Sequence, residues 1–203
     1  GGGGYGCLGH NVQADEYTPR LISALRGPLF ASNSPVRAAA GGTCSMILTK
    51  NGHVYYWGKH KQAGEATMRP TLNDALANNM HVVTAFSAGS QTVFCSTRNA
   101  ATVSWGHGTY GELGYGAGKA KSSSKPQFVE KLDKCLVTDV ACGYGHTLFL
   151  IRDEDEEDKN ALKRMKKLEK GDVVDFMAEV AVRKFASGGL DDDGGKKWGK
   201  GKK

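Results

Sequence analysis

The 203-residue sequence lacks several features that define common protein classes. No apolar run approaches 18 residues, so no membrane-spanning helix is expected. The five cysteines include no Cys-x-x-Cys pair, which disfavours a zinc site or a disulfide framework. We therefore interpret them as free thiols of a reduced, intracellular protein, and we expect Cys44 and Cys142 to behave as small apolar residues in strands.

Catalytic and metal-binding constellations are also missing. The histidines share no metal-ligand spacing, and His146 has no Asp or Ser near it at the spacing of a catalytic triad. The glycines at 114, 116 and 118 are followed by a polar stretch, whereas a phosphate-binding loop needs a helix there. The sequence thus predicts no cofactor, no metal and no covalent catalysis, and it favours a turn for the glycines.

What the sequence does contain is a repeated pattern. Residues 104–116 predict a strand ending in Trp105-Gly106 and then a turn of the form Tyr-Gly-x-Leu-Gly. The turn recurs at residues 5–9, and the strand end recurs at Trp57-Gly58, 48 positions before Trp105. Because the pattern returns near every 50 residues, it favours a propeller or a solenoid over an enzyme with a single site.

The local chemistry of one unit agrees with short β-strands. Residues 46–49 and 54–57 are apolar runs that flank Asn51-Gly52, the preferred sequence for a two-residue hairpin turn. Helical periodicity is almost absent before residue 153. The sequence predicts all-β units that become stable by stacking on their neighbours.

These motifs resemble the repeat of the regulator-of-chromosome-condensation family, over residues 1–152. Residues 111–116 and 140–154 resemble its mitotic chromosomal-passenger branch. The resemblance implies an all-β β-propeller, with about three of roughly seven blades in this chain, so we expect the C-terminal portion of a longer protein whose upstream blades are missing here. The residues that carry the repeat are Gly6, Leu8, Gly9, Gly41, Trp57, Gly58, Gly89, Trp105, Gly106, Gly111, Leu113, Gly114, Gly143 and His146.

Some positions depart from the family pattern. The histidine position of the repeat holds Cys44 and Thr92 in two copies, and only His146 keeps it. We expect His146 to lie in a blade core with its ring nitrogens bonded to backbone. The middle turn, at residues 62–65, has lost its Tyr-Gly-x-Leu-Gly form.

The pattern divides the chain into partial propeller repeats over 1–152, a charged helical extension over 153–187 and a disordered basic tail over 188–203. Within the first part we expect the end of a blade at 1–35, with an outer strand at 17–22. Two repeats follow at 36–81 and 82–136, and the opening strand of a further blade lies at 137–152. An acidic run at 153–158 precedes a helix-forming segment at 159–170, and a second helix is expected at 173–186.

Positive charge is concentrated in two places, within a net charge of +6. The serine-rich loop at 119–125 is either a solvated loop or a site for an acidic partner or phosphate. The tail is either a solubilising segment or a non-specific contact for nucleic acid. The candidate partner-binding residues are Lys119, Lys121, Lys125, Lys196, Lys197, Trp198, Lys200, Lys202 and Lys203.

The resemblance implies a protein of chromosome and mitotic regulation that binds a small Ras-like GTPase, as an exchange factor or as a binding platform. The alternative is a non-catalytic scaffold that attaches to chromatin or microtubules through the basic loop and tail. Either function places the protein at the nucleus and chromosomes and in the cytoplasm, on the cytoskeleton in mitosis, without a membrane partner. The contacts for exchange are not assigned from the sequence.

Overall fold

The computed structural model describes residues 1–59, 65–116, 119 and 121–165. Most of the predicted helical extension and the whole basic tail, with Lys196, Lys197, Trp198, Lys200, Lys202 and Lys203, lie outside the described residues.

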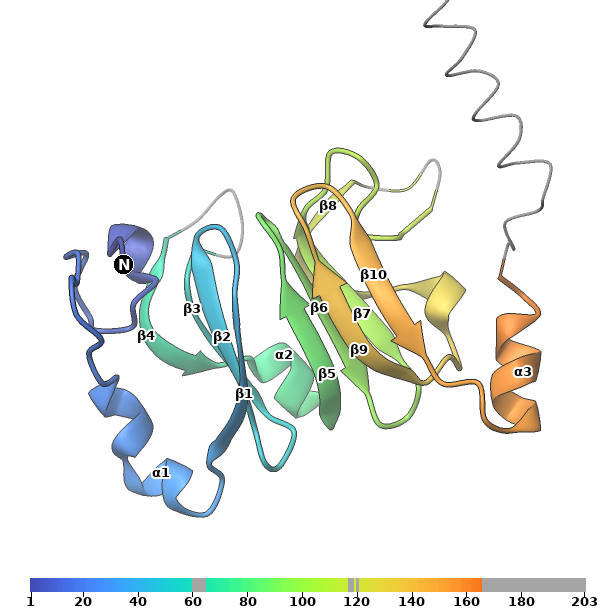
Figure 1. The fold of residues 1–203 in the computed structure, drawn as a ribbon, viewed down its shortest axis with the longest axis horizontal. Helices are drawn as coiled ribbons and strands as arrows, with labels where there is room; N and C mark the ends of the chain where they lie inside the picture. Colours follow the sequence, from blue (N-terminus) through green and yellow to red (C-terminus); the bar gives the residue numbers. More distant parts are fainter. Residues whose placement is uncertain (60–64, 117–118, 120, 166–203) are drawn as a thin grey trace, which may run out of the picture. The chain divides into compact units, whose positions relative to one another are not determined.

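Two four-stranded antiparallel sheets and one hairpin make up the fold (Figure 1). The first sheet contains β1 (Pro35–Ala40), β2 (Cys44–Thr49), β3 (Val54–Gly58) and β4 (Thr67–Leu72) in that order. The second contains β5 (Val83–Ala88), β6 (Thr92–Thr97), β7 (Thr102–His107) and β8 (Ser122–Phe128), and the hairpin contains β9 (Val137–Cys142) and β10 (Thr147–Ile151). Within each sheet every strand therefore pairs with the next one along the chain, as in the blades of a propeller.

Short helices occupy the connections. They are η1 (Gly4–Gly6), η2 (Ser23–Arg26), α1 (Pro28–Ala31), α2 (Asp74–Asn78), η3 (Glu130–Leu132) and α3 (Glu156–Leu162). Asn73 caps α2 by accepting a hydrogen bond from the Leu76 amide.

The predicted hairpin around Asn51 and Gly52 forms, but not as a two-residue turn. Only Gly52 has a positive φ, of 81°. The Gly52 amide donates to the Thr49 carbonyl, and the Thr49 amide donates to the His53 carbonyl. The loop is thus a turn followed by a glycine bulge, which needs a single left-handed residue.

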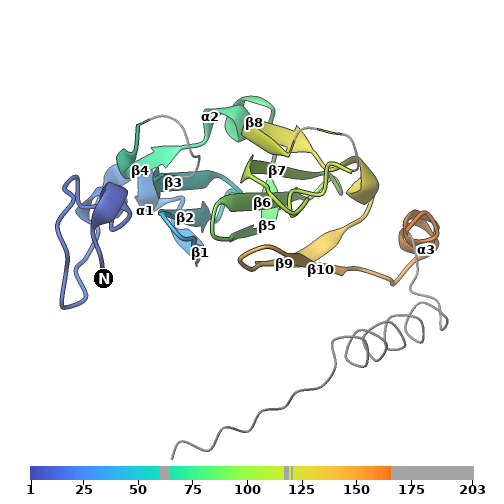
Figure 2. The same ribbon diagram turned by 90° about the horizontal axis from the view of Figure 1, so that it is seen from above.

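Successive sheets pack face to face through apolar side chains. One core joins the first sheet to the second and includes Met46, Leu48, Phe86 and Trp105. A second core joins the second sheet to the hairpin. In Figure 2, β1, β5 and β9 lie along one edge of these sheets and β4 and β8 along the other, so the blades stack in the order of the sequence.

The hairpin differs from the two complete blades in one respect. Phe94 of β6 is fully buried and packs against Phe149 of β10, with ring centroids 5.2 Å apart. Leu148 and Leu150 of β10 point the other way and are 66% and 65% exposed. Among the described residues, the outer face of the hairpin therefore has no blade against it.

Several expectations about local structure are wrong. Residues 17–22 form no strand, and the segment 137–152 supplies two paired strands rather than one opening strand. His146 is exposed and not a core residue, because its ring packs on Gly143 at the uncovered side of the hairpin. The helix begins at Glu156, inside the acidic run, and not after it.

Candidate interaction surface

The two glycines of the Tyr-Gly-x-Leu-Gly turn have the same backbone conformation in both described copies. Gly6 and Gly9 have φ of 70° and 74°, and Gly111 and Gly114 have φ of 84° and 74°. In each copy the amide of the last glycine donates a 2.9 Å hydrogen bond to the carbonyl of the first. A side chain would be strained at these positive φ values, so the repeated glycines are required by geometry.

Each turn is then fixed to strands of the following blade. The Cys7 carbonyl accepts hydrogen bonds from the Ser45 hydroxyl at 2.7 Å and from the Trp57 indole at 2.8 Å. The Glu112 carbonyl, at the same position of the later turn, accepts one from the Thr147 hydroxyl at 3.3 Å. These bonds hold the turns rigidly at one end of the strands.

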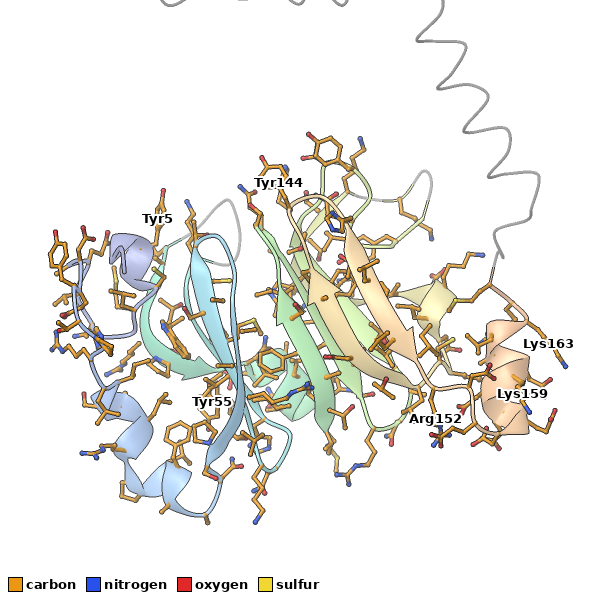
Figure 3. All side chains as sticks on the ribbon, in the orientation of Figure 1. Tyr5, Tyr55, Tyr144, Arg152, Lys159 and Lys163 are labelled. Carbon is orange, nitrogen blue, oxygen red and sulfur yellow. The ribbon has the colours of Figure 1, made fainter. Side chains whose placement is uncertain are left out.

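At that end, three loops meet to form what we call the loop cluster, residues 89–91, 107–114 and 143–146. The Tyr110 ring packs on Gly145, whose Cβ position lies 3.1 Å from a ring carbon. Figure 3 shows Tyr144 at the same end of the molecule. The loop cluster surrounds a cavity of about 190 Å³ lined by Ser90, Gln91, His107, Thr109, Tyr110, Glu112 and Tyr144.

Glu112 provides the negative charge of the loop cluster. Its two carboxylate oxygens accept hydrogen bonds from the Thr109 amide at 3.1 Å and the Tyr110 amide at 2.6 Å. Partial burial raises the pKa of Glu112, but backbone hydrogen bonds and the nearby His107 outweigh it, so the pKa lies below its usual value. Glu112 is therefore a carboxylate at neutral pH.

His107 connects the loop cluster to β8. Its Nδ1 lies 2.8 Å from the Ser122 hydroxyl, and its Nε2 lies 3.4 Å from the Thr109 hydroxyl. His107 is the last residue of β7, and it is half-buried.

The basic segment is only partly a loop. Lys119 and Lys121 are exposed between β7 and β8, and Lys119 borders a second cavity of about 360 Å³. Lys125 lies within β8, also exposed. The predicted loop at 119–125 thus shortens to the residues before Ser122, because polar residues here form an edge strand.

The repeat residues lie where the sheets meet their loops. Trp57 and Trp105 are 3% and 1% exposed, and Leu113 is 1% exposed. At four of the repeat glycines, a backbone atom of another residue lies within 2.7 Å of the position that a Cβ would take. These glycines are Gly41, Gly58, Gly89 and Gly106. These residues build the blades.

The described residues include no group of three His, Cys, Asp or Glu side chains placed to hold a metal ion. Within the same residues, no helix is long and apolar enough to cross a membrane. The loop cluster offers a ligand hydrogen bonds, charge and aromatic faces.

The sequence analysis did not identify Tyr110, Tyr144, Glu112 or Gln91 as site residues. The available signal was an aromatic or charged residue at variable positions of the repeat, such as Tyr144 in Cys-Gly-Tyr-Gly-His. A single sequence does not show that Tyr110 and Tyr144 meet, because that contact depends on how the hairpin packs on the β7–β8 turn.

Comparison with known proteins explains the repeat. The family model of the regulator of chromosome condensation (RCC1) repeat matches residues 104–150. The chain is 37% identical over 166 residues to the RCC2 homolog of Xenopus laevis and to RCC2 of Mus musculus, a match covering 81% of this chain. The chain belongs to the RCC1 repeat family. Within that family it is related to RCC2, and it spans 31% of the length of these two relatives.

Solved structures share the fold at lower identity. Prp20p from Saccharomyces cerevisiae matches with a TM-score of 0.51 and 22% identity, over 66% of this chain and 34% of that chain. Human WBSCR16 matches with a TM-score of 0.58 and 20% identity, over 73% of this chain and 38% of that chain. The all-β fold with propeller blades is thus shared across RCC1-type proteins.

Proposed function

We propose that this chain is a protein-binding propeller module of chromosome and mitotic regulation, and that its loop cluster contacts a small Ras-like GTPase. The observation that carries the proposal is the loop cluster, where the exposed rings of Tyr110 and Tyr144 stand on turns fixed by hydrogen bonds to the blades. Loops held by a rigid scaffold are common binding sites.

The family supports the choice of partner. The study of the Prp20p structure reports the binding of that protein to Gsp1p and to histones. The family model that matches residues 104–150 is described as a regulator of chromosome condensation, which supports the chromosome setting of this proposal. Tyrosine is enriched at protein interfaces because its ring adds contact area while its hydroxyl stays hydrated.

Nucleotide exchange by such a module is a binding effect. The module releases nucleotide only if it binds the nucleotide-free GTPase more tightly than the loaded form. Neither a cofactor nor a nucleophile is needed for this step. We therefore place any exchange activity in differential contacts of the loop cluster.

The test is release of a fluorescent guanine nucleotide from a panel of small GTPases incubated with the full chain. We expect acceleration for one GTPase, and we expect Tyr110→Ala to reduce it. Tyr17→Ala is the matched control, because Tyr17 is 94% exposed and lies outside the loop cluster. If a GTPase binds but its nucleotide release is not accelerated, the chain is a binding platform and not an exchange factor. If no GTPase binds, the proposal is rejected.

A second candidate is a scaffold on chromatin or microtubules. Lys119 and Lys121, in the connection between β7 and β8, and Lys125, in β8, are all exposed. Together with the lysines of residues 196–203, they favour this candidate. Attraction of lysines to phosphate or to acidic protein tails falls steeply with salt.

For this candidate we expect binding to nucleosomes or microtubules that weakens with salt and with the double variant Lys119→Glu, Lys121→Glu. The control is the double variant Lys50→Glu, Lys131→Glu. It makes the same charge change at two exposed positions, which lie after the ends of β2 and β8. Deleting residues 166–203 tests the tail. Binding that survives both the deletion and the loop variant would reject the scaffold.

A further inference from the structure

We propose that the cavity of the loop cluster binds one arginine side chain of a protein partner, held between Tyr110, Tyr144 and the Glu112 carboxylate. This inference rests on the proposed function, since it assigns the chemistry of the partner to the same surface.

The size of the cavity sets the class of ligand. Its volume is about 190 Å³, below the roughly 300–1,000 Å³ of small-molecule sites. It is open to solvent between two exposed tyrosines, Tyr110 at 73% and Tyr144 at 79% exposure. A cavity of this size suits a single side chain that enters from a partner's surface.

The charge of the cavity selects a cation. Among the described residues that line it, Glu112 is the only acidic one, and each of its carboxylate oxygens accepts one amide hydrogen bond. A carboxylate has about four lone-pair positions, so acceptor capacity is left for a ligand. The Glu112 carboxylate disfavours an anion, and a divalent metal ion would find one carboxylate among these lining residues, fewer than such sites usually provide.

The aromatic rings narrow the choice to arginine. The faces of tyrosine rings attract cations, arginine more often than lysine. A planar guanidinium also stacks on a ring while donating to a carboxylate, which a lysine ammonium does not do. Gln91 lines the same cavity, and a glutamine side chain carries a carbonyl oxygen that can act as a further acceptor.

The basic character of the chain does not oppose this assignment. The net charge of +6 includes Lys119 and Lys121, which precede β8. At physiological salt, exposed charges are screened beyond about 8 Å. Glu112 lines the cavity itself, so a guanidinium there interacts with it directly, and the loop cluster and the basic segment recognise ligands of opposite charge.

The test uses the ¹⁵N-labelled full chain and a short capped peptide, Gly-Ser-Arg-Ser-Gly. We expect amide shifts on titration at Tyr110, Glu112, Tyr144 and Gly145. The same peptide with citrulline, a neutral isostere of arginine, should cause none of them. A lysine peptide should bind more weakly than the arginine peptide.

Two variants separate the site from the fold. Tyr144→Ala removes a ring that is 79% exposed, and Glu112→Gln removes the charge while keeping one carbonyl acceptor. We expect each to weaken arginine-peptide binding by about tenfold, since a charged or cation–π contact is lost. Tyr17→Ala should leave binding unchanged.

Equal shifts with the citrulline peptide, equal binding of the lysine peptide, or wild-type binding by Tyr144→Ala would each overturn the arginine assignment. Nucleotide release measured on the same samples keeps the two proposals apart. If the peptide fails while a GTPase is still accelerated, only the arginine site is wrong. If the peptide binds and no GTPase does, the site stands and the GTPase partner is wrong.

Discussion

The amide of Gly42, in the turn between β1 and β2, donates a 3.1 Å hydrogen bond to the carbonyl of Gly89, in the turn between β5 and β6. Gly41 lies so close to the same carbonyl that a Cβ would come within 2.5 Å of it. A Cβ at Gly89 would likewise come within 2.7 Å of the Gly143 carbonyl in the hairpin. The same close approach of a glycine to a backbone carbonyl therefore occurs between both pairs of neighbouring blades, which explains why these glycines recur.

We predict that Gly89→Ala destabilises the chain by about 1–3 kcal/mol, as overpacking does in close-packed regions. The added methyl would meet backbone at Gly143 as well as the Thr92 hydroxyl at 2.6 Å. Urea denaturation followed by tryptophan fluorescence measures the change. Gly4→Ala is the control, because no atom lies within 4 Å of its Cβ position, and an equal loss in both variants would contradict the contact.

The repeat could be predicted from the sequence because the local geometry of each copy requires its glycines and tryptophans. Gly6 and Gly111 need positive φ wherever the turn occurs, and Trp57 and Trp105 fill equivalent buried positions. Such requirements leave the same residue at the same place in each copy. This is why two distant copies were enough to indicate blades.

Features that depend on neighbours could not be predicted in this way. His146 occupies the repeat position that would be covered by a further blade, and it is exposed. Strand β8 contains Lys125 and three serines, so it lacks the apolar alternation that marks a strand. The cavity arises only when Tyr110 packs on Gly145 of the hairpin.

Ser104 offers a test of how the later turn is held. Its side chain is fully buried and donates a 2.8 Å hydrogen bond to the Leu113 carbonyl. Ser104→Ala leaves that carbonyl without its donor, so we predict a loss of about 1–3 kcal/mol in the free energy of unfolding. Thermal or urea denaturation checks it against Ser124→Ala, an exposed serine of β8. Equal stability of the two variants would show that water replaces the hydroxyl.

The thiols should differ sharply in reactivity. Cys44, Cys95 and Cys135 are buried, and Cys7 and Cys142 are partly exposed. Burial raises the pKa of Cys44 to about 11, and it also raises the pKa of Cys95, Cys135 and Cys142. Only the thiolate reacts, so Cys7 should react first.

With Ellman's reagent at pH 8, we expect one fast thiol in the native chain and a slower second one. All five should react after denaturation. Cys7→Ser should abolish the fast phase, while Cys44→Ser should leave it intact. A native chain in which several thiols react at once would contradict the burial of these cysteines.

Arg152 and Asp158 attach α3 to the end of the hairpin, as Figure 3 shows for Arg152. The Arg152 Nε donates to the Asp158 carboxylate at 2.6 Å. The Asp155 side chain also accepts a hydrogen bond from the Asp158 amide, and the Asp158 side chain accepts one from the Asp155 amide, which together form a capping box. The hydrogen bond from Arg152 holds the pKa of Asp158 below its usual value, against a smaller opposing effect of burial. The charged form is therefore the one that stabilises the fold.

It follows that Asp158→Asn should be less stable than the wild type at pH 7, with faster hydrogen exchange of the α3 amides. The ordinary pKa of an aspartate is about 3.9, and the folded-state value lies below it. The stabilising effect is thus complete above the ordinary pKa and is lost as the pH falls through the folded value. Urea denaturation of both chains between pH 7 and pH 2 should show their difference shrinking only in the acid range. Asp153→Asn, at an exposed position, should show little difference at any pH, and a constant gap for Asp158→Asn would mean that packing, and not charge, holds α3.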